Sequence, residues 1–186
     1  MIVREMAELL VMDLVEKGVA TNQLVLHVGY DIDNLKNPEI ARNYHGPVTV
    51  DRYGRAAPKS AHGTINLDQY SSSTRKVVKA ALDLFEQITD KNLLIRRVSI
   101  TANHLLDETA LPPSDNCEQL SLFTDQTALQ REREKEQAEL ERERKKQKAM
   151  LSIKQKYGKN AILKASDLQE GATTIERNNQ IGGHQA

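Results

Sequence analysis

The stretch Leu24-Val25-Leu26-His27-Val28-Gly29-Tyr30 decides the fold of this chain, because large apolar side chains occupy every second position. Successive side chains of an extended chain point to opposite sides, so Leu24, Leu26, Val28 and Tyr30 share one side. The stretch therefore predicts a β-strand with one buried face.

The sequence around this strand predicts two amphipathic helices. Apolar residues at helical spacing run from Ile2 to Lys17, and Gly18 suits the position that follows a helix end. The second helix follows the run Ser71-Ser72-Ser73-Thr74, whose hydroxyls can cap its first turn. Its apolar stripe consists of Val77, Val78, Ala81, Leu82, Phe85 and Ile88.

Three more strands are expected. Residues 48–52 and 64–67 are short strand candidates, and we expect them to pair as a hairpin with a wide connection. Residues 31–46 are expected to form a polar loop. Residues 94–103 alternate as a last strand that closes the folded part.

This order of elements predicts an α+β fold, in which a two-layer arrangement places both helices on one face of an antiparallel sheet. In the last strand, alternation directs one set of side chains to the helices, namely Leu94, Val98, Ile100 and Ala102. The same alternation directs another set outward, together with Thr64 and Asn66: Arg97, Ser99, Thr101 and Asn103.

The outer face has two interpretations: the ordinary exposed surface of a two-layer fold, or a surface that contacts nucleic-acid backbones. Basic residues near strand ends and a helix start favour the second: Arg52, Arg55, Lys59, Arg75, Arg96 and Arg97. The chain has no Trp and only two Phe, which argues against an RNA-binding sheet with aromatic platforms. Sequence-independent contact with phosphates is therefore the form that we expect.

Composition limits the class of protein. Lys and Arg number 26 and so do Asp and Glu, so net charge gives no overall attraction to nucleic acid. One cysteine excludes an internal disulfide and a zinc cluster. The sequence shows neither a signal peptide nor a membrane-spanning apolar run, so we expect a cytoplasmic protein. No metal-site spacing or catalytic arrangement stands out, and we predict no catalytic and no metal-binding residues.

The chain divides into four parts. Residues 1–106 are the predicted folded domain, and 107–124 are a linker that contains Gln119-Leu120-Ser121-Leu122-Phe123. Residues 125–158 predict a highly charged helix without a heptad, which we expect to be a solvated spacer rather than a coiled coil. Residues 159–186 are expected to be a loosely ordered tail.

Several segments together resemble the little-finger domain of Y-family translesion DNA polymerases, in the UmuC-like (ImpB/MucB/SamB) branch of Gram-positive bacteria. They are Asp51-Arg52-Tyr53-Gly54-Arg55, Pro58-Lys59-Ser60-Ala61-His62-Gly63-Thr64, Ser72-Ser73-Thr74-Arg75 and Ile95-Arg96-Arg97-Val98. The resemblance includes the linker and the tail, and it implies that the outer sheet face grips duplex or primer-template DNA. The DNA-binding residues that it implies are Ser73, Thr74, Arg75, Arg96 and Arg97, with Arg55, Lys59 and His62 in the hairpin connection.

The linker peptide resembles the one by which bacterial polymerases hold the sliding clamp. This resemblance implies that Gln119, Leu120, Ser121, Leu122 and Phe123 bind the clamp, with the Gln amide setting orientation and the last two side chains filling an apolar pocket. A short extended segment packed on its own domain is the alternative.

The sequence departs from the family in two respects. Family members carry their Mg²⁺ carboxylates upstream of this domain, so we expect no cofactor on this chain and no polymerase activity from it alone. The family's little finger also begins with a strand before its first helix, and this chain starts at the helix. We expect that strand to be interior, so that its loss makes the domain less stable or leaves it to be completed by another chain.

Three functions follow as hypotheses. The first is the DNA-gripping, clamp-tethering C-terminal fragment of an error-prone polymerase in DNA damage tolerance and the SOS response, with a separate catalytic polymerase fragment as a partner. The second is a non-catalytic clamp-binding protein that competes with polymerases. The third is a nucleic-acid-binding adaptor unrelated to replication.

Overall fold

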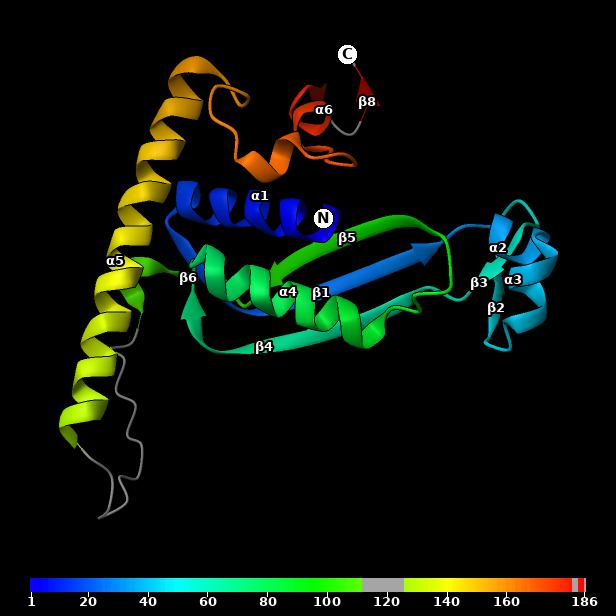
Figure 1. Ribbon diagram of the computed structural model, residues 1–186, viewed down its shortest axis with the longest axis horizontal. Helices are drawn as coiled ribbons and strands as arrows, with labels where there is room; N and C mark the ends of the chain where they lie inside the picture. The colour runs from blue at the N-terminus through cyan, green and yellow to red at the C-terminus, as the bar shows by residue number, and fades with distance from the viewer. Residues whose placement is uncertain (112–125, 182–183, 186) are drawn as a thin grey trace.

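The computed structural model describes residues 1–111, 126–181 and 184–185 (Figure 1). The main domain contains α1 (Ile2–Lys17), β1 (Val19–Tyr30), α2 (Asp33–Lys36), α3 (Pro38–Asn43), β2 (Val48–Val50), β3 (Ala56–Pro58), β4 (Ala61–Ser71), α4 (Thr74–Ile88), β5 (Ile95–Asn103) and β6 (Leu106–Asp107). A 3₁₀ turn at Glu108–Ala110 follows. The C-terminal part contains α5 (Gln126–Tyr157), a 3₁₀ turn at Ala165–Leu168, α6 (Thr174–Asn178), β7 (Gln180–Ile181) and β8 (His184–Gln185).

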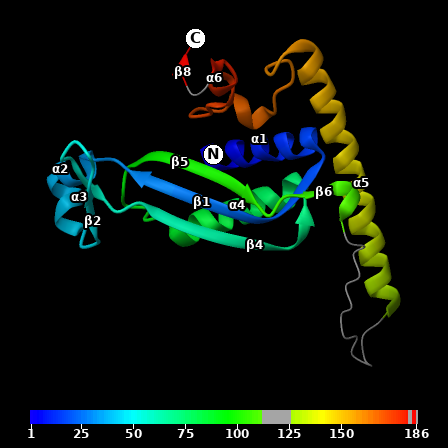
Figure 2. The ribbon, with the colours of Figure 1, turned by 180° about the vertical axis from the view of Figure 1, so that it is seen from behind.

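The sheet is antiparallel, with its long strands in the order β4-β1-β5 and with β6 paired to the start of β1. Helices α1 and α4 cover one face, and the other face is open when the molecule is turned round (Figures 1 and 2). The predicted two-layer α+β fold is confirmed. The strand recognised at residues 24–30 is the central one, and it begins earlier, at Val19.

The core lies between the sheet and the two helices. Leu24, Leu26 and Val28 are fully buried on the helix side of β1, as the alternation predicted. Burying a side chain of this size contributes roughly 1.5 to 3 kcal/mol. Gly63 of β4 allows α4 to approach closely, because a Cβ at this position would lie 2.6 Å from Cγ2 of Ile88.

Both predicted helix boundaries have the expected caps. Gly18 follows α1 in the left-handed conformation, with φ of 66°, and its N–H reaches the carbonyl oxygens of Leu14 and Val15. Ser73 precedes α4, and its hydroxyl accepts a hydrogen bond from the Lys76 N–H.

The region between β1 and β4 differs from the prediction. The expected polar loop contains α2 and α3, because Asn37 caps α3 with Pro38 in its first turn and the buried Asn34 amide binds the carbonyl oxygen of Leu94. The expected hairpin is wrong: β2 pairs with β3 across the tight Asp51–Arg55 turn, where Gly54 has φ of 75°.

The pairing of the long strands explains the rest of this difference. Residues 64–67 belong to β4 and pair with β1, with Leu24 opposite Ile65. The prediction that Leu94 faces the helices is also wrong, since Leu94 is 51% exposed and the strand begins at Ile95. Its carbonyl oxygen accepts hydrogen bonds from the Asp31 N–H and the Asn34 amide. Leu94 therefore contacts residues 31–34 through its backbone and does not pack in the core.

The strand that the family has before its first helix was expected to occupy an interior position in the sheet. This expectation is wrong, because the central strand is β1, which pairs with β4 on one side and with β5 on the other. The described residues contribute no strand beyond β4 or β5, so an additional strand could pair only at these two edges.

Helix α5 forms where the charged sequence predicted a helix, but it is not a solvated spacer. It crosses the ends of α1 and α4, and Leu151 packs against the core between these helices and the sheet (Figure 1). The tail has little regular structure, yet it makes specific contacts with α1: the Thr173 N–H and hydroxyl donate to the Glu5 carboxylate.

Candidate nucleic-acid interface

The open face of the sheet is formed by its three long strands, β4, β1 and β5 (Figure 2). Strand register gives the rows Asn66–Gln23–Asn103, Thr64–Val25–Thr101 and His62–His27–Ser99, followed by Gly29 beside Arg97. The predicted outward set, Arg97, Ser99, Thr101, Asn103, Thr64 and Asn66, is therefore brought together on one surface. Small hydroxyl and amide side chains of this kind suit contact with phosphates and sugars.

The first row is held by its own hydrogen bonds. The Gln23 amide donates to Oδ1 of Asn66 at 2.9 Å, and the Asn103 amide donates to Oε1 of Gln23 at 3.1 Å. The Thr21 hydroxyl donates to the Asn103 carbonyl oxygen at 2.6 Å. These bonds fix the direction of the amides, so the row is preorganised for a ligand.

The positive charge on this face lies at the end of the sheet where β1 ends and β5 begins. Arg96 and Arg97 are both exposed at the start of β5. Arg97 lies opposite Gly29, and Arg96 is the unpaired residue of a bulge, because Tyr30 pairs with Ile95. A bulge directs side chains out of the regular ladder, which gives two arginines access to one ligand.

Arg55 and Lys59 lie in the extension formed by α2, α3, β2 and β3, beyond this end of the sheet (Figure 1). The Arg55 guanidinium pairs with Asp51 at 2.7 Å, and this hydrogen bonding lowers the pKa of the Asp51 carboxyl. Lys59 is exposed, with its N–H bound to the Pro47 carbonyl oxygen.

The tip of this extension holds a residue that sequence reasoning missed. Tyr53 is 66% exposed, and the guanidinium carbons of Arg52 and Arg55 lie 4.7 and 5.2 Å from its ring centre. The signal in the sequence is an aromatic residue between two arginines in a glycine turn. The tip therefore presents a cationic, partly apolar surface.

Ser73, Thr74 and Arg75 lie at the opposite end of the sheet. Thr21 at the start of β1 pairs with Ser71, whereas Gly29 near its end pairs with Arg97. Eight residues of strand separate these pairs by about 26 Å. The predicted DNA-binding residues therefore form two groups rather than one patch.

Carboxylates of α5 contact this second group. The Ser73 hydroxyl donates to Oε2 of Glu143 at 2.6 Å, and the Arg75 N–H donates to Oε1 of the same carboxylate at 3.1 Å. The Arg75 guanidinium binds Glu139 at 2.6 Å. Lys76 binds Glu136 at 2.8 Å and lowers the pKa of that carboxyl. The spacing of Glu136, Glu139 and Glu143 is the sequence signal that could have revealed this acidic face.

The sequence of this domain has a counterpart among known families. The impB/mucB/samB family C-terminal domain matches residues 1–122 of the 186-residue chain. The chain belongs to this family. The match supports the C-terminal part of a UmuC-like Y-family translesion polymerase, with DNA repair and damage tolerance as its setting. A search of curated proteins found no match to the chain.

The impB/mucB/samB domain as matched extends into the predicted linker. The clamp-binding candidates Gln119, Leu120, Ser121, Leu122 and Phe123 lie outside the residues that the structure describes. Their role therefore stays a prediction.

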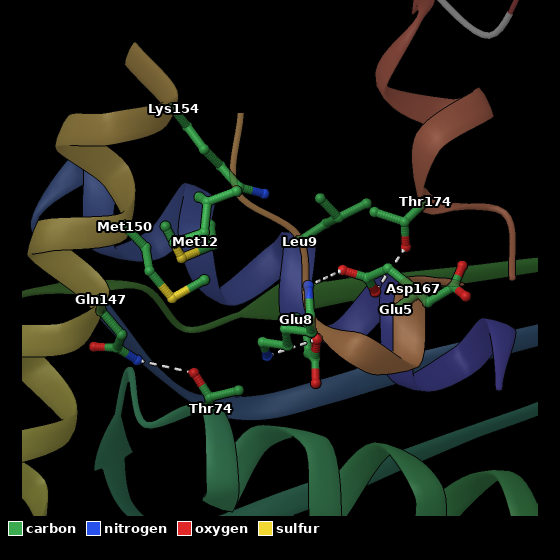
Figure 3. Close-up of a pocket in the computed structure, with 12 residues that line it drawn as sticks. Glu5, Glu8, Leu9, Met12, Thr74, Gln147, Met150, Lys154, Asp167 and Thr174 are labelled. Carbon is green, nitrogen blue, oxygen red and sulfur yellow. Dashed lines mark hydrogen bonds and ion pairs between the residues drawn. The ribbon is translucent and has the colours of Figure 1, made fainter. Parts of the chain in front are cut away.

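A small cavity lies where α1, α5 and the tail of this family member meet (Figure 3). Its volume of about 50 Å³ is too small for a nucleotide. Lys164 pairs with Glu8 at 2.7 Å beside it, and burial lowers the pKa of Lys154, which lines it. We interpret this cavity as a packing junction that fixes the tail on the impB/mucB/samB domain.

Among the described residues 1–111, 126–181 and 184–185, no group of three or more His, Cys, Asp or Glu side chains could hold a metal ion. None of the helices in this part of the family member combines the length and apolar character that a membrane-spanning segment requires.

Proposed function

We propose that the chain is the DNA-gripping, clamp-tethering C-terminal part of an error-prone Y-family polymerase from the Gram-positive UmuC-like branch. Family membership gives the polymerase region. The observation that carries DNA binding is the open sheet face, where rows of hydroxyl and amide side chains lead to Arg96 and Arg97. Such a face binds backbones without reading bases.

The division of labour on this face follows from its chemistry. Arg96 and Arg97 supply the charge that binds phosphates, and Thr64, Thr101 and Ser99 supply uncharged donors along the open face. Lys59 extends the positive charge beyond the sheet end, where the Arg55 guanidinium is paired with Asp51. The hydrogen-bonded amides of Asn66, Gln23 and Asn103 lie at the opposite end of the same surface.

Polymerisation itself is assigned elsewhere. Phosphoryl transfer by polymerases uses Mg²⁺ held by carboxylates, which the family resemblance assigns to a catalytic palm rather than to this domain. The proposal gives this chain positioning of DNA and gives the chemistry to that palm.

The test of DNA binding compares two double variants by fluorescence anisotropy on duplex DNA over a range of salt. Arg96→Ala with Arg97→Ala removes two charges at the sheet end, whereas Arg131→Ala with Arg142→Ala removes two exposed charges on α5. Log affinity falls as log salt rises, and we expect the first variant to make this negative slope shallower by about 1.8, at about 0.9 per lost phosphate contact. Equal effects of both variants would contradict the assignment to this face.

Clamp tethering is tested separately, with a purified bacterial sliding clamp. We expect Leu122→Ala with Phe123→Ala to abolish binding, because these side chains are the proposed apolar anchors. The control Ser121→Ala removes one hydroxyl and should retain binding. Clamp binding that survives the double change would overturn the tethering role.

A second function is favoured by one observation: α5 carboxylates contact Ser73 and Arg75, which a DNA-binding protein would use for phosphates. A clamp-binding competitor of polymerases needs no free phosphate-binding surface. Clamp binding without any salt-dependent DNA binding would favour this function over the first.

A further inference from the structure

Helix α5 places a strip of three carboxylates over the basic start of α4. This acidic strip consists of Glu136, Glu139 and Glu143, which contact Lys76, Arg75 and Ser73. We propose that the acidic strip stands in for DNA phosphates, and that the N-terminal part of α5, residues 126–143, must move away before this end of the domain can bind a nucleic-acid backbone. The inference rests on the proposed DNA-binding function and adds regulation to it.

The contacts of Glu143 are those that an anionic oxygen ligand would make. One carboxylate oxygen accepts from the Ser73 hydroxyl at 2.6 Å, and the other accepts from the Arg75 N–H at 3.1 Å. Both donors lie at the start of α4, Ser73 as its cap and Arg75 in its first turn, where the helix dipole favours negative charge. The Arg75 guanidinium adds a charged donor, which is at present bound to Glu139 at 2.6 Å. The same donors would suit a phosphate group.

The two parts of α5 are held differently. In the C-terminal part, from Arg144 onward, the Gln147 side chain is only 5% exposed and donates to the Ser72 carbonyl oxygen at 2.9 Å and the Thr74 hydroxyl at 3.0 Å. Leu151 packs on the core, and Arg144 pairs with Glu108. This part is an anchor that the displacement leaves in place.

The N-terminal part, residues 126–143, is held by ion pairs at the surface and by the half-buried Glu143 carboxylate, which accepts from Ser73 and Arg75. Arg75 and Glu139 have side chains 57% and 62% exposed, and the Lys76–Glu136 pair is 33% and 50% exposed. Exposed pairs are weak and are screened by salt. DNA can therefore compete for the same cations, and it gains counterion release when it does.

The test replaces the two carboxylates that bind Arg75 and compares them with two on the opposite side of the same helix. Glu139→Gln with Glu143→Gln is the test variant, and Glu134→Gln with Glu141→Gln is the control with the same change in net charge. Helical spacing places Glu134 and Glu141 away from α4. Each variant of the full chain is measured for duplex affinity at low and moderate salt, with helix content checked by circular dichroism.

We expect the test variant to bind duplex DNA about fivefold more tightly than the control variant, because it removes the exposed Arg75–Glu139 pair and the Glu143 charge at the start of α4. Equal affinities of the two variants overturn the inference. They leave DNA gripping intact if Arg96→Ala with Arg97→Ala still weakens binding. Absence of duplex binding by every variant overturns both the inference and the proposed function.

Hydrogen exchange measures displacement of α5 directly, because a change in net charge alone would not alter amide exchange rates in one segment of the helix. On addition of duplex DNA to the unmodified chain, we expect amides of residues 130–143 to exchange faster while those of residues 147–157 keep their protection. Unchanged or increased protection over residues 130–143 in a DNA-bound sample would overturn displacement.

Discussion

The two ends of the central strand carry similar residues in different surroundings. At the end near Gly29, Arg96 and Arg97 are exposed, and α5 lies at the other end of the molecule (Figure 2). At the end near Thr21, Ser73 and Arg75 have equally suitable donors but hold carboxylates of the same chain. Basic residues at a helix start thus indicate an anion-binding surface, and only their neighbours decide whether it is free.

The largest expected effect is a loss of stability that affects both ends of the sheet, because it comes from a change in the central strand. Leu26→Ala removes a fully buried side chain from the strand that joins them, and such changes cost about 2 to 5 kcal/mol. Urea unfolding measures the loss in the free energy of unfolding. Val25→Ala, on the outer face of the same strand, is the control and should cost less. A loss below that of the control would contradict the central role of β1.

A smaller effect is expected at the end of the sheet that α5 covers, where Ser73 and Arg75 lie. Gln147→Ala leaves the Ser72 carbonyl oxygen and the Thr74 hydroxyl without this donor, at a cost of about 1 to 3 kcal/mol. Hydrogen exchange should rise along α5 and stay unchanged in β5. The exposed Gln137→Ala is the control, and equal exchange in the two variants would show that Gln147 is not an anchor.

The cap of α4 provides the next comparison. Ser73→Ala removes the hydroxyl that accepts from the Lys76 N–H and donates to Glu143, so we expect a loss of about 1 kcal/mol. Ser60→Ala, exposed beside β4 at the other end, should change stability by less than about 0.5 kcal/mol. Equal losses in urea unfolding would remove the distinction between the ends.

Acid should weaken the covered end by the smallest amount. Hydrogen bonding to Lys76 lowers the pKa of Glu136 below its ordinary value of 4.5, so the folded state favours the carboxylate. The stabilisation is fully present above pH 4.5 and is lost as the pH falls through the lowered value. The pair is exposed, so we expect a few tenths of a kcal/mol.

The measurement is urea unfolding at several pH values between neutral and strongly acidic. Glu136→Gln should reduce the loss of stability below pH 4.5 relative to the unmodified chain. Glu134→Gln is the control on the other side of α5. Identical acid profiles of the three proteins would contradict the ion pair.

The elements with strong local patterns could be predicted from the sequence. The helix over Ile2–Lys17 has its glycine stop, α4 has its serine cap, and the period of two in β1 and β5 assigned most side chains to the correct face. The extension could not be predicted in full, because a three-residue strand such as β2 lacks a distinctive period. Its pairing with β3 depends on the tight turn at Gly54.

The candidate site divides in the same way. The outward set on β5 follows from alternation, so the sequence by itself determined the polar face and its arginines. The sequence also determined that residues 126–157 form a helix, since their charged pairs stabilise one locally. Only the tertiary structure decided where that helix lies and that Glu143 meets Ser73, because a contact between residues 70 positions apart depends on packing and has no local signal.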